Sequence, residues 1–395
     1  MRGRLQGLTF NNPAKTYDGY TLFAPMNPSE PYGQVWLIDM QGEFVHRWKM
    51  AHTPGSHGVL LPNGNLLYAG RKATEMSPGF GGCGGELVEV DWDGNVLWKY
   101  ENPFMHHDFS RMPNGNTIFL GLVKTPRDIA AKVKGGVAGS EREGVMWVDS
   151  IHEITPEGKV IWEWIGYEHL DPEADAICPL CDRNEWTHCN ACSVLPDGNV
   201  LISMLKQNTI AIIDKATGNL KWRWGLKEGM GHQHHPNMLE NGNILVFDNG
   251  SHRPALGQGF IPPASRVLEI DPATKEIVWE YYDEERLNFW GPYISGCQRL
   301  SNGNTLICEG PFGRFFEVTA DRELVWEYVS PFHSSYPPNL GRNNAVYRAY
   351  RYGPDYPGLK GRELSPGRFE WVVQKKAVSP GAEKVIEERL RRLGY

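Results

Sequence analysis

Pairs of apolar segments separated by a short polar turn recur along the whole chain. Five of these turns have nearly the same sequence, with Asn-Gly-Asn or Asp-Gly-Asn between the two apolar segments. An Asn-Gly or Asp-Gly dipeptide in this setting predicts a β-hairpin, and we expect a type I′ turn in which both central residues have positive φ. The five turns lie at residues 62–65, 113–116, 196–199, 240–243 and 301–304.

A second kind of hairpin alternates with the first, and its second strand carries a tryptophan. The six tryptophans are Trp48, Trp98, Trp162, Trp222, Trp279 and Trp326. Because they recur in every repeat, whereas a binding site occurs once, we expect them to pack between repeats. A two-hairpin unit repeated roughly every 40 to 50 residues is typical of a β-propeller blade. The sequence therefore predicts a single all-β propeller with four-stranded blades.

The two kinds of hairpin are unequal in number, because six carry a tryptophan and five have the Asn-Gly-Asn type of turn. Residues 344–352 have the pattern of a strand, and residues 20–24 can pair with them. Both chain ends would then complete a sixth blade, which removes the exposed strand edges of an open ring. We expect a six-bladed β-propeller at residues 1–360 and a C-terminal extension at 361–395, with a short surface helix at 382–393.

The composition narrows the partners of this propeller. The chain has 395 residues, 41% of them hydrophobic, and a net charge of −7. Since it has no long run of Lys or Arg, we expect neither nucleic acid nor a membrane surface as a partner. No stretch reaches the roughly 18 apolar residues of a membrane helix, and no apolar segment follows the basic start of the chain. A cytoplasmic location is therefore the expectation, and the oligomeric state stays open.

Histidines lie at matched positions before the Asn-Gly-Asn turns of four blades. In a propeller the first strand of each blade lines the central channel, so side chains at matched positions meet around one mouth. Convergent polar groups on a rigid scaffold are typical of an active site. The sequence therefore predicts a site in the channel that is built from several blades. Its candidate residues are His57, His107, His188, Asn190, His234 and His235.

The order of several motifs resembles the bacterial arylsulfate sulfotransferases. These motifs occupy residues 17–23, 186–190, 233–235, 241–250, 348–352 and 355–358, and the resemblance extends over about residues 17–358. It implies a six-bladed propeller that transfers a sulfuryl group from one phenol sulfate to another phenol. It also implies a sulfo-histidine intermediate, with no nucleotide donor and no cofactor required.

The resemblance also implies roles for individual residues. His235, or its neighbour His234, matches the nucleophile of the family. His107 and His188 match sulfate-contacting histidines, and Asn190 matches an amide donor. A neutral imidazole can attack sulfur and hold the sulfuryl group as a labile N-sulfonate, and further histidines can transfer protons near neutral pH.

The sulfate-binding arginine of the family has no counterpart on the strand after residues 186–190. Lys206 is the cation in that region, and its ammonium lacks the planar fork that binds an oxyanion through two hydrogen bonds. Arg348, on the sixth inner strand, can replace the arginine or form a structural salt bridge. The side chains expected to contact a small aromatic substrate, some of them as aromatic walls, are His57, His234, Arg348, Tyr293 and Trp186.

A transition-metal site is the alternative, because imidazoles that converge from several blades bind Zn, Cu or Fe as readily as an anion. A metal-dependent enzyme acting on a small, aromatic molecule would follow, with an open coordination position. Asp108 or Glu185 would then orient the ligand rings. The ligands in this interpretation are His57, His107, His188 and His235.

Two Cys-x-x-Cys pairs lie seven residues apart, Cys178 with Cys181 and Cys189 with Cys192. Such pairs indicate a structural zinc site when all four thiolates can converge. If the second pair lies in a strand, however, its two side chains point to opposite faces and cannot easily bind one ion. Packed reduced thiols and a disulfide therefore stay open beside zinc.

Overall fold

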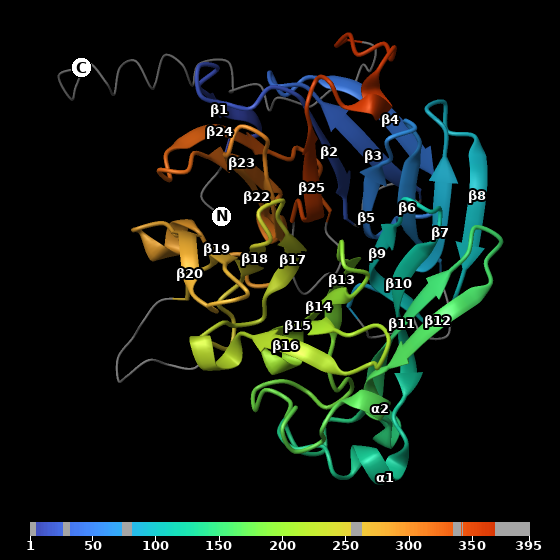
Figure 1. Ribbon diagram of the computed structural model, residues 1–395. Coiled ribbons are helices and arrows are strands. Elements are labelled where there is room, and N and C mark those ends of the chain that lie inside the picture. The colour runs from blue at the N-terminus through green and yellow to red at the C-terminus, as the bar shows by residue number, and fades with distance from the viewer. Residues whose placement is uncertain are drawn as a thin grey trace.

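The computed structural model describes residues 5–26, 32–72, 81–253, 263–334, 341 and 343–367. Within these residues six antiparallel sheets are arranged as blades around a central axis (Figure 1). The predicted six-bladed β-propeller is thus confirmed. The helix expected at residues 382–393 lies outside the described residues.

The first three blades follow the chain in order, apart from one strand taken from its far end. Blade 1 contains β25 (Val346–Tyr352), β2 (Tyr20–Pro25), β3 (Gly33–Ile38) and β4 (Phe44–Met50). Blade 2 contains β5 (Pro54–Leu60), β6 (Leu66–Arg71), β7 (Gly85–Val90) and β8 (Val96–Glu101). Blade 3 contains β9 (Met105–Arg111), β10 (Thr117–Lys124), β11 (Trp147–Ile154) and β12 (Val160–Ile165).

The next three blades complete the ring. Blade 4 contains β13 (Cys189–Val194), β14 (Val200–Met204), β15 (Thr209–Ile213) and β16 (Leu220–Trp224). Blade 5 contains β17 (His234–Met238), β18 (Ile244–Asp248), β19 (Arg266–Ile270) and β20 (Ile277–Tyr281). Blade 6 contains β21 (Gly296–Arg299), β22 (Thr305–Glu309), β23 (Arg314–Val318), β24 (Leu324–Val329) and an added strand, β1 (Gly7–Asn11).

The described helices are short and lie in the connections. Two are α-helical, α1 (Arg127–Ala130) and α2 (Gly166–His169). The 3-10 helices are η1 (Arg142–Gly144), η2 (Leu205–Gln207), η3 (Leu226–Glu228), η4 (Arg286–Asn288), η5 (Gly310–Phe312) and η7 (Pro357–Leu359). None of the described helices is both long enough and apolar enough to cross a membrane.

The two chain ends close the ring. Strand β25 pairs antiparallel with β2, with Tyr352 opposite Tyr20 and Ala349 opposite Phe23. The prediction that both ends complete one blade is confirmed. The prediction of four strands in every blade is wrong for blade 6, because β1 adds a fifth strand along the outer edge of β24. This added strand also protects that edge from pairing with another chain.

A cycle of tryptophan hydrogen bonds joins each blade to the next. The indole N–H groups donate from Trp48 to Asp91 O, Trp98 to Pro156 O, Trp162 to Lys215 O, Trp222 to Pro272 O, Trp279 to Ala320 O and Trp326 to Met40 O, at 2.7–3.1 Å. The last bond connects blade 6 back to blade 1. The expectation that these tryptophans pack between blades is confirmed.

The five Asn-Gly-Asn turns form hairpins, but not of the expected type I′. In each turn the glycine has a φ between 85° and 89°, whereas the preceding Asn or Asp has no positive φ. In the first turn the Gly64 N–H donates to Leu61 O at 2.9 Å, which describes a type I turn followed by a left-handed glycine. Pro62 favours this turn because its ring fixes a negative φ at the second position.

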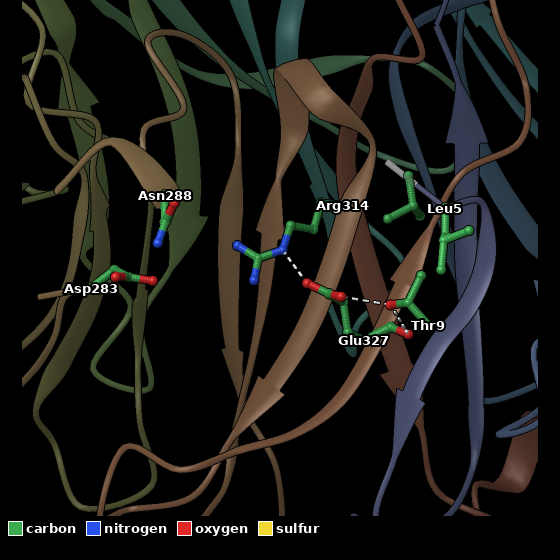
Figure 2. A pocket seen from close by; sticks show the side chains of 7 residues that line it. Leu5, Thr9, Asp283, Asn288, Arg314 and Glu327 are labelled. Carbon is green, nitrogen blue, oxygen red and sulfur yellow. Dashed lines mark hydrogen bonds and ion pairs between the residues drawn. The ribbon is translucent and has the colours of Figure 1, made fainter. Parts of the chain in front are cut away.

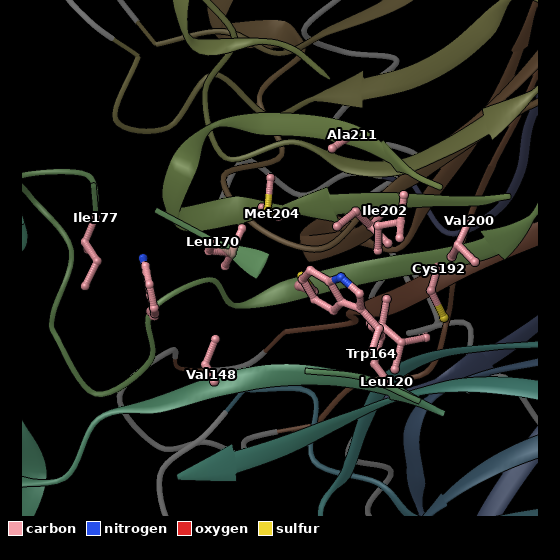
Figure 3. Packing of buried hydrophobic residues seen from close by; sticks show 14 of the residues in the cluster. Leu120, Val148, Trp164, Leu170, Ile177, Cys192, Val200, Ile202, Met204 and Ala211 are labelled. Carbon is pink, nitrogen blue, oxygen red and sulfur yellow. The ribbon is translucent and has the colours of Figure 1, made fainter. Parts of the chain in front are cut away.

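The largest hydrophobic cluster lies between blades 3 and 4 (Figure 3). Trp164 from β12 and Leu120 from β10 face Ile202 from β14, and all three are almost fully buried. Alternate residues of each strand point into such layers, which explains the period of two in the apolar pattern. The packed layers hold the blades rigidly, so residues on the inner strands have fixed positions at the axis.

Candidate functional site

The first strand of each blade lines the axis of the propeller. These inner strands are β5, β9, β13, β17, β21 and β25, and each contacts the next around a closed ring. The candidate histidines lie on or next to four of them: His57 on β5, His106 and His107 on β9, His188 just before β13, and His234 and His235 on β17. Sequence offsets from the turns therefore placed them on the correct strands.

Backbone bulges aim several of these histidines. His107, His188 and His235 have φ of 49°, 49° and 52°, a left-handed conformation that is uncommon for residues other than glycine. At or next to each of them, the pairing of the inner strand with its neighbour shifts register. A bulge redirects a side chain out of the regular alternation, and such devices are frequent beside active sites.

A buried carboxylate orients His107 through its neighbour. His106 Nε2 lies 3.1 Å from Gly121 O and 3.1 Å from Asp149 Oδ1, so it faces two acceptors and carries the proton. In the neutral ring His106 Nδ1 is then an acceptor, and His107 Nδ1–H donates to it at 2.8 Å. This arrangement leaves the Nε2 lone pair of His107 free.

His188 is oriented directly by a carboxylate. Its Nδ1–H donates to Glu185 Oε2 at 2.7 Å, and its ring centroid lies 4.6 Å from that of His107. Burial lowers the pKa of His188, but the Glu185 carboxylate outweighs this effect and the pKa lies above the usual 6.5. His188 is therefore the histidine of this cluster that best retains a proton near neutral pH.

The two neighbouring histidines of β17 have opposite ring orientations. His234 Nδ1 faces two acceptors, Asn249 Oδ1 at 2.8 Å and His232 O at 3.1 Å, so it carries the proton and Nε2 keeps its lone pair. His235 Nδ1 instead accepts the Cys297 N–H at 3.2 Å, which places the proton of the neutral ring on Nε2. Burial lowers the pKa of His234 to about 3 and holds that of His235 well below its usual range.

Tyr347 occupies the middle of the channel. Its ring centroid lies 5.7 Å from that of His57, 6.2 Å from that of His107 and 6.5 Å from that of His234. Its hydroxyl donates to Asn190 O at 2.9 Å, which connects β25 to β13 across the axis. Three of the candidate histidines are thus grouped around one aromatic ring.

Arg348 is committed to a salt bridge. It donates to both oxygens of Asp108, at 2.8 and 3.2 Å, and to Asn190 O at 2.9 Å. Of the two roles expected for it, the structural salt bridge is the one that this geometry supports. Asp108 also lies 3.6 Å from Nε2 of His57, a fully buried ring whose pKa is held well below its usual range by burial and by Arg348.

Lys206 and Asn190 bind other parts of the protein. Lys206 Nζ donates to Asp182 O at 3.0 Å and to Asp182 Oδ1 at 3.1 Å. Asn190 Nδ2 donates to Gln233 O at 2.8 Å, and its Oδ1 is buried without a hydrogen-bond partner among the described residues. The ammonium of Lys206 is therefore already paired with Asp182.

Two glycines bring a loop down onto the imidazoles. Gly82 O accepts the backbone N–H of His107 at 2.8 Å. A Cβ at Gly82, where φ is +66°, would lie 2.4 Å from Nε2 of His107, and a Cβ at Gly81 would lie 3.5 Å from Cε1 of His188. At position 82 only glycine permits this approach, whereas 3.5 Å at position 81 is an ordinary contact. The loop therefore lies directly against the two imidazoles.

Of the two expected aromatic walls, Trp186 lies away from the channel and Tyr293 packs near Tyr347. Trp186 is completely buried in the cluster between blades 3 and 4, where its indole donates to Asp175 O at 2.7 Å. The expectation that it faces a substrate is wrong, because the insertion around Asp175 folds over the indole. Tyr293 is partly buried and packs in a small cluster with Tyr347 and Ala345.

The metal interpretations need correction. Among the described residues, the one group with ligand atoms close enough to share an ion is Cys178, Cys181, His232 and His252. The channel set of His57, His107, His188 and His235 is not such a group, because its ligand nitrogens do not all lie within 4.8 Å of one another. The four-cysteine set is also wrong: Cys189 packs in the core of β13 and Cys192 Sγ faces Asp108 O at 3.8 Å.

A hollow away from the histidines lies beside blade 6 (Figure 2). Thr9 and Arg314 both bind Glu327 there, at 2.6 and 2.5 Å. A second carboxylate, Glu309, also pairs with Arg314 at 3.2 Å. The arginine charge is therefore balanced by two carboxylates of the protein. No histidine is among the described residues that line the hollow.

Sequence reasoning missed the residues that orient the rings. His106, Asp149 and Asn249 determine which nitrogen of His107 and of His234 carries the proton. Asn249 lies within the motif at residues 241–250, so its position was available as a signal. No sequence signal pointed to Asp149, because it lies on β11 and contacts His106 only in the folded blade.

The fold and the site together define a propeller whose channel holds several imidazoles with fixed ring orientations, suited to nucleophilic and acid–base chemistry. The chain belongs to the arylsulfotransferase (ASST) family, whose sequence model matches residues 57–331. This result confirms the resemblance seen in the motifs, and membership of the family indicates a transferase.

The solved structures found to be similar are distant in sequence. A protein of unknown function from Bacteroides caccae is 13% identical, with a TM-score of 0.52 and coverage of 85% of this chain and 98% of that chain. A virginiamycin B lyase from Staphylococcus aureus is 11% identical, with a TM-score of 0.43 and coverage of 81% and 87%. At these identities the likeness concerns the fold alone. No curated protein sequence matches the chain significantly.

Proposed function

We propose that the protein transfers a sulfuryl group from an aryl sulfate to a second phenol, and that His234 carries the group between the two half-reactions. The orientation of His234 supports this most strongly: Asn249 holds its Nδ1–H at 2.8 Å and leaves the Nε2 lone pair free. Because burial lowers the pKa of His234 to about 3, the ring is neutral and nucleophilic near neutral pH. The matching family supports the reaction class.

In the first half-reaction, Nε2 of His234 attacks the sulfur of the aryl sulfate. The S–N bond forms while the bond from sulfur to the phenolic oxygen breaks. His188, whose pKa is raised by Glu185, gives its Nε2 proton to the departing phenolate. The products are a free phenol, a neutral His188 and an N-sulfonated His234.

In the second half-reaction the roles reverse. Neutral His188 takes the proton of the incoming phenol, whose oxygen attacks sulfur while the S–N bond breaks. His234 returns to its neutral form and His188 to its protonated form. Throughout, the Nε2–H of His235 can donate to a non-bridging oxygen, since its Nδ1 is occupied by the Cys297 N–H.

The choice of His234 over His235 rests on these ring orientations. The motif resemblance leaves both histidines open as the nucleophile. A ring whose Nε2 carries the proton must lose it before attack, whereas His234 has its lone pair available at once. His235 is therefore assigned as a donor to the sulfuryl oxygens.

A burst experiment tests the proposal. Enzyme mixed with nitrophenyl sulfate and no acceptor should release about one nitrophenol per site, as expected for a covalent intermediate. Fragmentation of the trapped peptide should place the added sulfonate mass on His234. His234→Ala should abolish the burst, while His235→Ala should slow it and His169→Ala, in α2 outside the channel, should leave it unchanged. A sulfonate found on His235, or a full burst from His234→Ala, would reject the assignment.

A further inference from the structure

A second cluster of ligating side chains lies beside the channel and takes no part in the proposed transfer. Cys178 and Cys181 come from the insertion between α2 and β13, His232 precedes β17 and His252 follows β18. Each offers one ligand atom, and the four atoms all lie within 4.8 Å of one another. Three connections of the chain therefore converge on one point.

The distances within this cluster match a tetrahedral ion. Cys181 Sγ lies 3.3 Å from His232 Nε2 and 3.5 Å from His252 Nδ1, and Cys178 Sγ lies 3.6 Å from the same His252 nitrogen. Zinc bonds of about 2.3 Å to sulfur and about 2.0–2.1 Å to nitrogen, at tetrahedral angles, place sulfur and nitrogen ligands about 3.5 Å apart. An ion can therefore sit between these atoms with little rearrangement.

The backbone is shaped to present these ligands. The Cys181 N–H donates to Cys178 O at 2.9 Å, which closes the turn of the Cys-x-x-Cys motif. His232 and His252 have φ of 52° and 54°, a left-handed conformation that is strained for a residue other than glycine. Two such residues in one cluster are expected where a ligand compensates for the strain.

We propose that Cys178, Cys181, His232 and His252 bind a structural zinc ion. Two thiolates and two imidazoles in tetrahedral positions are typical ligands of zinc, and four protein ligands leave no open position for a substrate. The first Cys-x-x-Cys pair thus keeps the metal role expected from its spacing, but its partners are two histidines from other connections.

The zinc site fixes two segments that carry channel residues. His232 O accepts the Nδ1–H of His234 at 3.1 Å. Lys206 O accepts the Cys178 N–H at 2.7 Å, and the Lys206 N–H donates to Thr187 O, next to His188, at 3.0 Å. Loss of the ion would therefore loosen both histidines of the proposed reaction, although the presence of the ion does not depend on that reaction.

Metal analysis of the full-length protein, purified without a histidine tag or chelator, tests the inference. We expect about one zinc per chain, and X-ray absorption should show two sulfur and two nitrogen ligands. Replacement of zinc by Co²⁺ should give the visible spectrum of a tetrahedral thiolate site. A disulfide between Cys178 and Cys181, seen as a mass lower by two hydrogens, or a chain that takes up neither metal, would overturn the inference.

Variants locate the ion. Cys178→Ser with Cys181→Ser should abolish zinc binding, and His252→Ala should lower zinc affinity by at least tenfold while leaving the two thiolates in place. Cys308→Ala, a buried cysteine on β22, is the matched control and should keep one zinc. If the double variant does not fold, the loss of zinc affinity in His252→Ala locates the ion instead. Full zinc content in the double variant would place the ion elsewhere and overturn the assignment.

Discussion

Asp108 and Arg348 form a two-point ion pair across the channel, although they lie 240 residues apart in the sequence. The hydrogen bonds measure 2.8 and 3.2 Å, and both side chains are almost fully buried. Asp108 lies on β9 of blade 3 and Arg348 on β25 of blade 1. The pair therefore connects two blades that are separated by blade 2, near the centre of the ring, where a single unpaired charge would be poorly solvated.

We expect Asp108→Asn to lower the free energy of unfolding by about 3–5 kcal/mol, because it leaves the buried guanidinium without its partner. Arg348→Met should have a similar effect. The double variant should lose clearly less than the sum of the two single losses, since no buried charge remains. Urea unfolding of the four proteins measures this coupling. Additive losses would show that the two residues stabilise the protein independently.

The contact between Glu185 and His188 predicts a pH dependence. Since the folded pKa of His188 lies above its ordinary 6.5, the ion pair stabilises the protein fully below about pH 6.5 and less as the pH rises through the raised pKa. Glu185→Gln should remove this contribution. The stability difference between wild type and Glu185→Gln should therefore be largest at mildly acidic pH and should shrink toward alkaline pH.

The same substitution tests the proposed acid. If His188 protonates the departing phenolate, Glu185→Gln should move the alkaline limb of the rate profile to lower pH, because His188 then loses its proton earlier. Nitrophenol release measured from pH 6 to pH 9 gives the profile. An unchanged alkaline limb would assign the proton to another group.

Replacing different tryptophans of the cycle should lower the free energy of unfolding by unequal amounts. Trp326→Phe should lower the free energy of unfolding by about 2–4 kcal/mol, because the indole is fully buried and its hydrogen bond to Met40 closes the ring. Trp98→Phe is the matched control, since its bond to Pro156 is exposed to solvent, and it should cost less than about 1 kcal/mol. Equal losses in thermal or urea unfolding would contradict a special role for the closing bond.

The architecture was predictable because the same information is repeated in every blade. A hairpin turn such as residues 62–65 and a tryptophan such as Trp48 recur along the chain. A blade with a weak pattern can therefore be assigned by comparison with the other blades. The extra strand β1 could not be predicted in this way, since it occurs once and has no repeat to compare with. The expected turn type was wrong because each loop has three residues rather than two: the Leu61 N–H donates to Asn65 O, and the same bond recurs in the turns without proline. Three-residue loops favour a type I turn followed by a left-handed glycine.

The site was only partly predictable. Matched offsets placed the histidines on inner strands, but they contain no information on which ring nitrogen carries a proton. That property depends on acceptors such as Asp149 and Asn249, which come from other strands. The two Cys-x-x-Cys pairs show the same limit: identical spacing gives a metal-ligating turn at Cys178 and a packed strand at Cys189, because only the surrounding backbone differs.

Gly82 offers a test of the loop that lies against the imidazoles. We expect Gly82→Ala to slow nitrophenol release at least tenfold, because the new methyl group would overlap Nε2 of His107, 2.4 Å away. Gly139→Ala is the matched control, since Gly139 has a similar φ of +74° but nothing within 4 Å of its Cβ position. Both substitutions carry the backbone strain of about 1 kcal/mol, so both should lower the melting temperature slightly. The rate should fall only in Gly82→Ala. Equal rates in the two variants would mean that the loop does not shape the site.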